Sequence, residues 1–352
     1  MTTQILTQTE RPARQEEERE AGRFLFSPWH LVLIPIAVVM LIPMVWMLVT
    51  SLETLNETRH FPPVLLPHTL VPGNYTQVLQ QAPFARWFVN TMIVTVATVA
   101  GNLLSPPQWI GLANYRALPS DPLFRQSLVH SLIYTALFVP LSVVGGLLAA
   151  VALNRRIRGI FLYRTAVFVP EVLSTIATAI MFLWLLDPNF GLVNFLLSKV
   201  GLGPYGFFDS INGALYTIVG MTVWGWIGFD VIVYLAALQG IPQSLVEAAE
   251  IDGVRTWSMF RNITFPLLGP ATLFLVVWST INALQLFDEV YLSTQGGPLN
   301  ATTVLVYYLY EQAFNQFNFG YASAIAYFLF LLIIVVTVIQ FRVGRRFTYY
   351  RS

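Results

Sequence analysis

Stretches of mostly apolar residues separated by short polar segments run along this sequence from residue 29 to residue 341. A helix needs about 20 mostly apolar residues to cross a lipid bilayer. We identify seven candidates, of which the second is the shortest and carries Asn90 and Asn102. The alternation typical of membrane β-strands is absent, so the pattern predicts an all-α, polytopic membrane helix bundle. The stretches lie at about 29–50, 87–104, 127–153, 160–186, 211–238, 268–288 and 321–341.

Composition supports an integral membrane protein. Hydrophobic residues make up 56% of the chain and charged residues only 11%, whereas soluble domains carry roughly 25% charged residues. The net charge of +1 gives no reason to expect a nucleic-acid partner. Cysteine is absent, which excludes disulfides and thiol catalysis. The only lysine, Lys199, is followed by Val200, so a Walker A loop is excluded. We therefore expect no cofactor in this chain, and any ATP must be bound by a partner subunit.

Basic residues indicate which loops face the cytoplasm. Four arginine clusters precede or follow the apolar stretches, and all four favour the cytoplasmic side. The last three clusters all lie on the cytoplasmic side if the chain crosses the membrane five times after residue 127. An N-terminus on the cytoplasmic side requires an even total number of crossings, whereas the seven candidate stretches give an odd number. Whether the segment 87–104 crosses the membrane is therefore left open. The clusters are Arg11, Arg14, Arg19 and Arg23; Arg155, Arg156 and Arg158; Arg255 and Arg261; and Arg342, Arg345, Arg346 and Arg351.

The first 24 residues mix acidic and basic side chains and contain no apolar core. They do not fit a secretory signal. We expect residues 1–24 to form a disordered cytoplasmic tail.

A polar island at residues 240–270 separates two long apolar stretches. Ser244 and Glu247 have the spacing of a capping box and predict a helix start there. Gly253 permits a left-handed turn, and a second short helix is expected over 254–262. Two prolines at 266 and 270 then mark the entry to the next apolar helix. An ordinary cytoplasmic loop with two surface helices fits this pattern as well as an interaction site.

The island resembles the cytoplasmic EAA loop of the permeases of binding-protein-dependent ABC importers. In that family, the loop docks into a cleft of the ATP-binding subunit. The usual alanine after the glycine is Val254 here, and the usual leucine before the first proline is Phe265. We use the name EAA loop for residues 240–270. The resemblance assigns coupling to the ATPase to Glu247, Ala248, Ala249, Asp252 and Gly253.

From Trp109 onward the chain is similar to carbohydrate-type (maltose- or glycerol-phosphate-like) permeases of this class. The similarity includes DPNFGLVN at 187–194, FDEVYLSTQGGP at 287–298 and GYASA at 320–324. It implies a type I ABC importer permease fold with six core spans plus one extra N-terminal hydrophobic segment. It also implies a bacterial or archaeal cytoplasmic membrane location. The implied partners are a second permease subunit, a dimer of ATP-binding subunits, an extracytoplasmic solute-binding protein and membrane lipid.

A short direct repeat lies on either side of residue 105. Asn74-Tyr75 and Phe84 precede one apolar stretch, and Asn114-Tyr115 and Phe124 precede the next. The first copy resembles one permease partner and the second copy resembles the other. A fusion or duplication junction near Ser105 would explain the extra segment, and a genuine seven-segment variant is the alternative. We divide the chain into residues 1–24, the partner-like region 25–104, and the transmembrane domain 105–352 with the EAA loop.

Ionisable or hydrogen-bonding residues inside apolar stretches are candidates for a solute path. Glu171 follows Pro170, and Asp230 lies within the fifth stretch. Spacings of three and four place Asn282, Gln285 and Glu289 near one helix face. We select Asn282, Gln285 and Trp278 as path residues, with hydrogen bonding between helices as the alternative for the two amides. Interface anchoring or packing is the alternative for Trp278 and for two further tryptophans, Trp224 and Trp226.

Two other function classes compete with an importer permease. An ion-coupled secondary transporter, which acts without an ATPase, is typically built from inverted repeats, whereas the repeat in this sequence is short and direct. A membrane-embedded enzyme would need a reactive cluster, and neither H-E-x-x-H nor G-x-S-x-G occurs. We therefore expect a non-enzymatic permease that moves a sugar or related polyol, with the secondary transporter as the alternative.

Overall fold

A computed structural model describes residues 28–52, 71, 89, 92–93, 110–155 and 157–344. Every regular element among them is helical, which confirms the predicted all-α bundle. Within these residues, four single helices are long and apolar enough to cross a membrane, and two bent pairs bring the number to six if each pair counts as one span. The single helices are α2 (His30–Ser51), α7 (Pro122–Leu153), α11 (Ala214–Gln239) and α18 (Phe319–Gly344).

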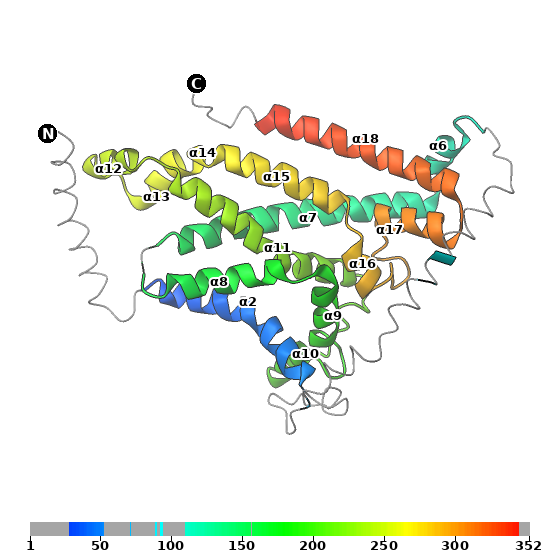
Figure 1. The fold of residues 1–352 in the computed structure, drawn as a ribbon, viewed down its shortest axis with the longest axis horizontal. Coiled ribbons are helices and arrows are strands. Elements are labelled where there is room, and N and C mark those ends of the chain that lie inside the picture. Colours follow the sequence, from blue (N-terminus) through cyan, green and yellow to red (C-terminus); the bar gives the residue numbers. More distant parts are fainter. Residues whose placement is uncertain are drawn as a thin grey trace.

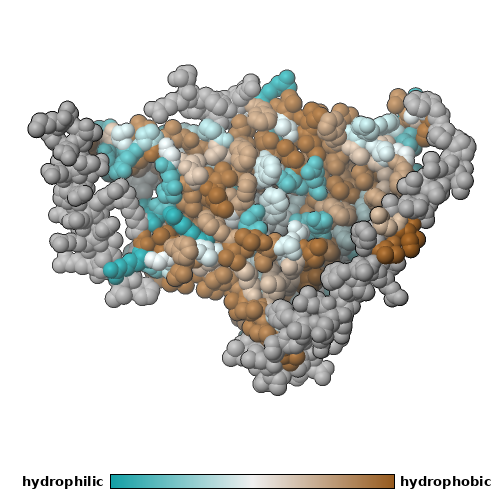
Figure 2. Space-filling model, in the orientation of Figure 1, coloured by the Kyte–Doolittle hydropathy of each residue, from teal (hydrophilic) through white to brown (hydrophobic). Residues whose placement is uncertain are grey.

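The long helices α7, α11 and α18 run roughly along the long axis of the molecule, whereas α9 runs across it (Figure 1). α7 and α11 form the centre and pack closely along their length. α15 (Gly269–Leu284) and α18 lie on one side of this pair, and α8 (Ile160–Val172) and α2 lie on the other. Apolar side chains cover most of the face shown in Figure 2, while polar groups gather at the end where α12 lies and across the middle.

Small residues allow the central pair to approach closely. A Cβ added to Gly146 of α7 would collide with the Cβ of Asp230 on α11. The Asp230 side chain is fully buried and accepts a hydrogen bond from the Ser142 hydroxyl. A buried carboxylate needs such a partner to offset its desolvation, so glycine and serine on α7 make room and supply a donor for the same aspartate.

The fourth apolar stretch does not form one continuous helix. It is divided into α8 and α9 (Thr175–Leu185), which meet at an angle of 102°. This turn is much larger than the bend that a proline such as Pro170 usually introduces into a helix. Leu173 and Ser174 both have extended backbone, and the Ser174 hydroxyl oxygen accepts a hydrogen bond from the Ala177 N–H at 3.2 Å as the N-cap of α9.

The sixth apolar stretch also differs from the expectation. Residues Thr256–Leu267 form helical turns that meet α15 at an angle of 63°. α15 ends at Leu284, and Glu289 lies on a separate short helix, α16 (Asp288–Ser293). The predicted common helix face of Asn282, Gln285 and Glu289 is therefore wrong, because the chain turns at residues 285–287.

A hydrogen-bonded cluster closes the end of the bundle opposite the EAA loop. Asp121 is the N-cap of α7 and accepts a hydrogen bond from the Leu123 N–H at 2.9 Å. It also accepts hydrogen bonds from the hydroxyls of Tyr308, on α17 (Leu305–Tyr310), and Tyr321, on α18, at 2.5 and 2.7 Å. The Gln312 amide donates to the Tyr308 hydroxyl in turn. One carboxylate therefore ties three helices together.

The loop after α16 folds back onto α7 through glycines and threonines. Gly296 has a φ of +80°, and an added Cβ would lie 2.7 Å from the Thr303 hydroxyl oxygen. The Thr302 hydroxyl donates to the Gly297 carbonyl, and the Leu305 N–H donates to the Ser131 hydroxyl of α7. Residues 294–298 (TQGGP) therefore form a hydrogen-bonded loop at the end of the bundle where Asp121 lies.

The remaining elements connect these parts. They are α6 (Ala113–Ala117), η1 (Leu118–Ser120), α10 (Leu192–Lys199), α12 (Gln243–Ile251), α13 (Thr256–Met259), η2 (Phe260–Thr264), α14 (Phe265–Leu267) and η3 (Glu311–Asn315).

Counting six spans places the start of α2, the residues between α7 and α8, the EAA loop and the end of α18 at one end of the bundle. The described residues thus hold an even number of spans, which agrees with the arginine clusters of the sequence. Most of the segment 87–104 lies outside the described residues. So do residues 1–24 and most of the region 53–109, and the proposed junction near Ser105 is among them. α2 packs against α8 and α9.

Candidate functional site

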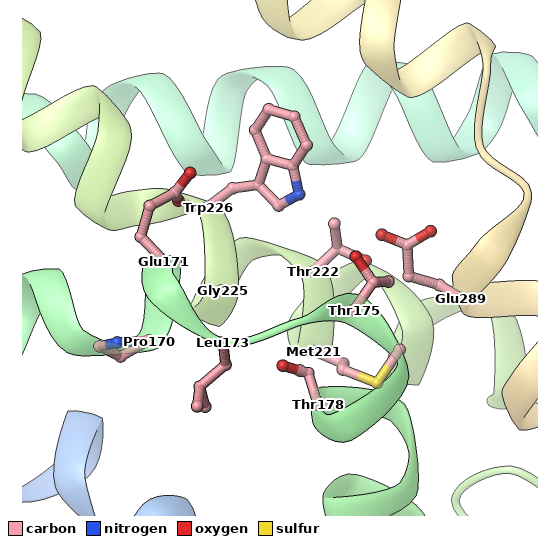
Figure 3. Close-up of a pocket in the computed structure, with 10 residues that line it drawn as sticks. All are labelled: Pro170, Glu171, Leu173, Thr175, Thr178, Met221, Thr222, Gly225, Trp226 and Glu289. Carbon is pink, nitrogen blue, oxygen red and sulfur yellow. The ribbon is translucent and has the colours of Figure 1, made fainter.

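A cavity of about 120 Å³ lies where α8, α9, α11 and α16 meet, and we call it the α8–α11 cavity. A cavity of about 150 Å³ holds a benzene ring, so this one has room for part of a sugar ring, and a whole sugar requires it to widen. Figure 3 shows Glu171 beside Trp226 on one side, three threonines in the middle, and Glu289 on the other side. The lining residues are Pro170, Glu171, Leu173, Thr175, Thr178, Met221, Thr222, Gly225, Trp226 and Glu289.

The break between α8 and α9 creates this space. An uninterrupted α8 would continue alongside α11, whereas the turn at Leu173 and Ser174 directs α9 away at 102°. Thr175 and Thr178, one turn apart on α9, then face the cavity together with Thr222 of α11. Hydroxyl groups are both hydrogen-bond donors and acceptors, so these three threonines can bind a polar solute.

Carboxylates dominate the charge of the site. Glu171 and Glu289 line the cavity, and no lysine, arginine or histidine is among its lining residues. Asp230 does not line the cavity, and its carboxylate accepts a hydrogen bond from the Ser142 hydroxyl. Among the described residues, no group of three or more His, Asp or Glu side chains could hold a metal ion.

The path residues selected from the sequence lie elsewhere. Trp278, Asn282 and Gln285 are not among the residues that line the α8–α11 cavity. Trp278 is 42% exposed and stacks on Phe274, with ring centroids 6.2 Å apart. The Asn282 amide donates to the Trp278 carbonyl at 2.9 Å, within its own helix. Their place along a solute path stays a prediction.

The EAA loop forms two short helices joined by a tight turn. Glu247, Ala248 and Ala249 lie on α12; Ala249 is buried, whereas Glu247 and Ala248 are exposed. Asp252 is the C-cap of the helix, and Gly253 has a φ of +69°. The predicted left-handed turn at Gly253 is therefore confirmed.

Two backbone hydrogen bonds identify this turn as a Schellman motif. The Val254 N–H donates to the Ala249 carbonyl, and the Gly253 N–H donates to the Glu250 carbonyl, both at 3.0 Å. The predicted capping box is wrong: α12 starts at Gln243 after Pro242, without a side-chain cap. Proline already fixes the backbone at this start.

Apolar side chains project from the EAA loop. Ile251 is 86% exposed and Trp257 is 71% exposed. The Trp257 ring stacks on Phe260, with centroids 5.8 Å apart, and Phe260 contacts Phe265 in turn. The second helix expected over 254–262 is shorter, since α13 covers only Thr256–Met259 before the π-helical turn η2. The aromatic row ends at Phe265 in α14, one turn residue before α15 begins, so the loop leads directly into a spanning helix.

Comparison with protein families decides the class of this chain. Residues 142–349 match the family described as "binding-protein-dependent transport system inner membrane component". The chain belongs to this permease family.

Individual relatives agree with this assignment. The lactose transport system permease protein LacF of Rhizobium radiobacter is 37% identical over 263 residues, which cover 73% of this chain and 87% of that protein. The sn-glycerol-3-phosphate transport system permease protein UgpA of Agrobacterium fabrum is 33% identical over 293 residues, which cover 82% of this chain and 98% of that protein.

Solved structures support the fold. The structure of a bacterial ABC transporter involved in the import of the acidic polysaccharide alginate matches 78% of this chain and 99% of its own chain. The TM-score is 0.64 at 23% sequence identity. A bacterial alginate ABC transporter has also been solved in complex with an alginate pentasaccharide-bound periplasmic protein. The permease described here is accordingly a multi-pass protein of the inner membrane, as expected, and its family consists of transport components.

The sequence alone pointed to part of this site. Glu171, Trp226 and Glu289 stand out as polar or aromatic residues within apolar stretches, but nothing in the sequence groups them. The three threonines were missed, because threonine in an apolar helix is common and its hydroxyl often bonds to its own backbone, as Thr222 does to Ile218. The useful signal is Ser174 four residues after Pro170, which marks the end of one helix and the start of another.

Proposed function

We propose that this permease is a membrane subunit of an ATP-driven importer and moves a sugar or related polyol through the α8–α11 cavity. The observation that carries the proposal is the EAA loop, which is folded, exposes Ile251 and Trp257, and lies at the end of the bundle where α7 ends and α8 begins. The names of the lactose and sn-glycerol-3-phosphate relatives support the solute class.

The EAA loop is the site where ATP-binding subunits dock. The exposed Ile251 and Trp257 side chains provide apolar contact area, and Glu247 provides a charge for a basic partner surface. Ala248, also exposed, lets the helix approach closely, and Asp252 and Gly253 fix the turn. Because α14 leads into α15 through the single turn residue Leu268, movement of the docked subunits would tilt the spanning helix.

The remaining parts of the importer complete this arrangement. ATP is bound by a dimer of partner subunits, and this chain carries no cofactor. A second permease subunit completes the pathway, and an extracytoplasmic binding protein delivers solute to the end that holds Asp121. Trp278, Asn282 and Gln285 extend the path beyond the cavity. The fused or duplicated origin of residues 25–104 stays a separate hypothesis.

A co-purification experiment tests the docking step. Ile251→Ser and Trp257→Ala should each reduce the amount of ATP-binding subunit recovered with the permease. They should also reduce the ATPase activity that solute-loaded binding protein stimulates. Leu299→Ser is a matched control, because Leu299 is an apolar residue that is 80% exposed in the loop after α16. Equal recovery of the ATP-binding subunit with all three variants would contradict the proposed docking site.

A further inference from the structure

The charged side chains around the α8–α11 cavity are almost all acidic. The four elements that form it carry Glu171, Asp230, Asp288 and Glu289, and Arg164 is their only cation. Arg164 does not line the cavity, and its guanidinium donates to the Leu153 carbonyl at 3.1 Å. On α7, Arg125 is exposed, and His130 bonds to the Thr303 carbonyl. Among the described residues, a solute inside the cavity therefore meets two carboxylates and no basic side chain.

The geometry holds these carboxylates in place. Glu171 lies at the end of α8, where close packing against Gly228 of α11 fixes the helix. Glu289 lies on α16, which packs against α9. In Figure 3 the two side chains lie on opposite sides of Thr222. A solute that reaches the threonines has a carboxylate on either side.

Such a site should bind neutral solutes more favourably than anionic ones. Carboxylate oxygens accept charge-assisted hydrogen bonds from sugar hydroxyls or from an ammonium group. A phosphate or carboxylate on the solute would instead face like charges in a space with low dielectric, where repulsion is much stronger than in water. Placing like charges against the wrong ligand is a general way to obtain specificity.

We infer that the α8–α11 cavity selects neutral or cationic polyhydroxylated solutes and rejects anionic ones. The inference rests on the proposed function, because it takes the cavity as the solute route. It separates this permease from relatives whose names denote anionic solutes, sn-glycerol 3-phosphate and alginate.

Thiol labelling can measure this selectivity without knowledge of the solute. The chain contains no cysteine, so Thr222→Cys places a single thiol on this chain between the two carboxylates. The assembled importer in proteoliposomes is treated with methanethiosulfonates that carry a trimethylammonium, a sulfonate or a neutral methyl group. Mass spectrometry of this chain gives the rate for each reagent. The cation-to-anion rate ratio is compared with that of free 2-mercaptoethanol.

The expected ratio is about tenfold or more above that of 2-mercaptoethanol, the size of effect seen in clefts lined by charges of one sign. Glu171→Gln combined with Glu289→Gln should return it to the free-thiol value. Asp288→Asn is the matched control and should leave it unchanged, because Asp288 is exposed and does not line the cavity. Thr178→Cys gives a second reporter, and single glutamine variants replace the double variant if it does not assemble.

A ratio equal to that of 2-mercaptoethanol at both cysteines would overturn the inference. So would a high ratio that the glutamine variants leave unchanged. Absence of reaction with the neutral reagent, both without nucleotide and with ATP, would also overturn it, because the cavity would then be closed to solutes. ATP-dependent uptake of labelled lactose by cysteine-free importer in proteoliposomes separates the two proposals. Lactose uptake together with a cation-to-anion rate ratio equal to that of 2-mercaptoethanol would contradict the charge selection alone. A high ratio without lactose uptake would contradict the transport proposal alone.

Discussion

Gly228 of α11 lies directly against Glu171 of α8. A Cβ added to Gly228 would be 3.2 Å from the Cβ of Glu171 and 2.8 Å from the carbonyl oxygen of Val167. The second distance involves backbone, which cannot move unless α8 moves. The position of one wall of the α8–α11 cavity therefore depends on the absence of a side chain at residue 228.

Gly228→Ala should displace α8 and reduce transport. Overpacking of this kind costs about 1–3 kcal/mol, so the melting temperature of the purified permease should fall together with solute uptake. Gly220→Ala on the same helix is the control, because no atom lies within 4 Å of its added Cβ. If both variants behave alike, the close approach of α8 and α11 does not determine the cavity.

Asp121 should contribute a pH-dependent part of the stability. Burial alone would raise the pKa of this carboxyl, but hydrogen bonds from Tyr308, Tyr321 and two backbone N–H groups outweigh it and lower the pKa below its ordinary value of 3.8. A lowered pKa in the folded state means that the stabilisation is complete above the unfolded-state pKa. It is lost as the pH falls through the folded-state pKa.

Thermal unfolding of Asp121→Asn and wild type across the acidic range tests this linkage. The wild type should be more stable near neutral pH, and the difference should shrink as the pH falls below about 4, the usual range for an aspartate. Tyr308→Phe should lose about 1 kcal/mol with one hydrogen bond and should show a smaller pH dependence than the wild type. A stability difference that stays constant down to the most acidic pH would rule out the ionised carboxylate as its source.

The Schellman turn at Gly253 predicts a defect in coupling. Gly253→Ala places a side chain at a φ of +69°, a conformation that costs an L-residue roughly 1–2 kcal/mol. The variant should assemble its membrane bundle normally but bind ATP-binding subunits less tightly, as measured by titration of the purified components. Gly240→Ala at the start of the EAA loop has an ordinary φ of −79° and should bind them like the wild type.

Asn282→Ala and Gln285→Ala test the path residues chosen from the sequence. Each should lower solute uptake and leave assembly and basal ATPase activity intact, because neither side chain holds helices together in the described part of the chain: Asn282 donates within its own helix, and Gln285 is exposed. Unchanged uptake in both variants would remove them from the path and leave the α8–α11 cavity as its main polar segment.

The length and apolar character of the segments were enough to predict α2, α7, α11 and α18, because a membrane span is determined by about 20 consecutive residues. The turn at Gly253 was also predictable, since it depends on one residue type. The break after Val172 was not, because Pro170 usually produces a bend and the 102° turn depends on packing of α9 against α16. The cavity depends on residues from four elements, and their proximity is a tertiary property that local sequence does not contain.

The most direct test of the proposed importer is uptake by proteoliposomes that contain this permease, its permease partner and the ATP-binding subunits. Radiolabelled lactose with solute-binding protein is supplied outside, and either ATP inside or an imposed proton or sodium gradient is the energy source. We predict uptake that requires ATP and the binding protein and does not respond to either gradient. Uptake driven by a gradient without ATP would contradict the importer and identify a secondary transporter.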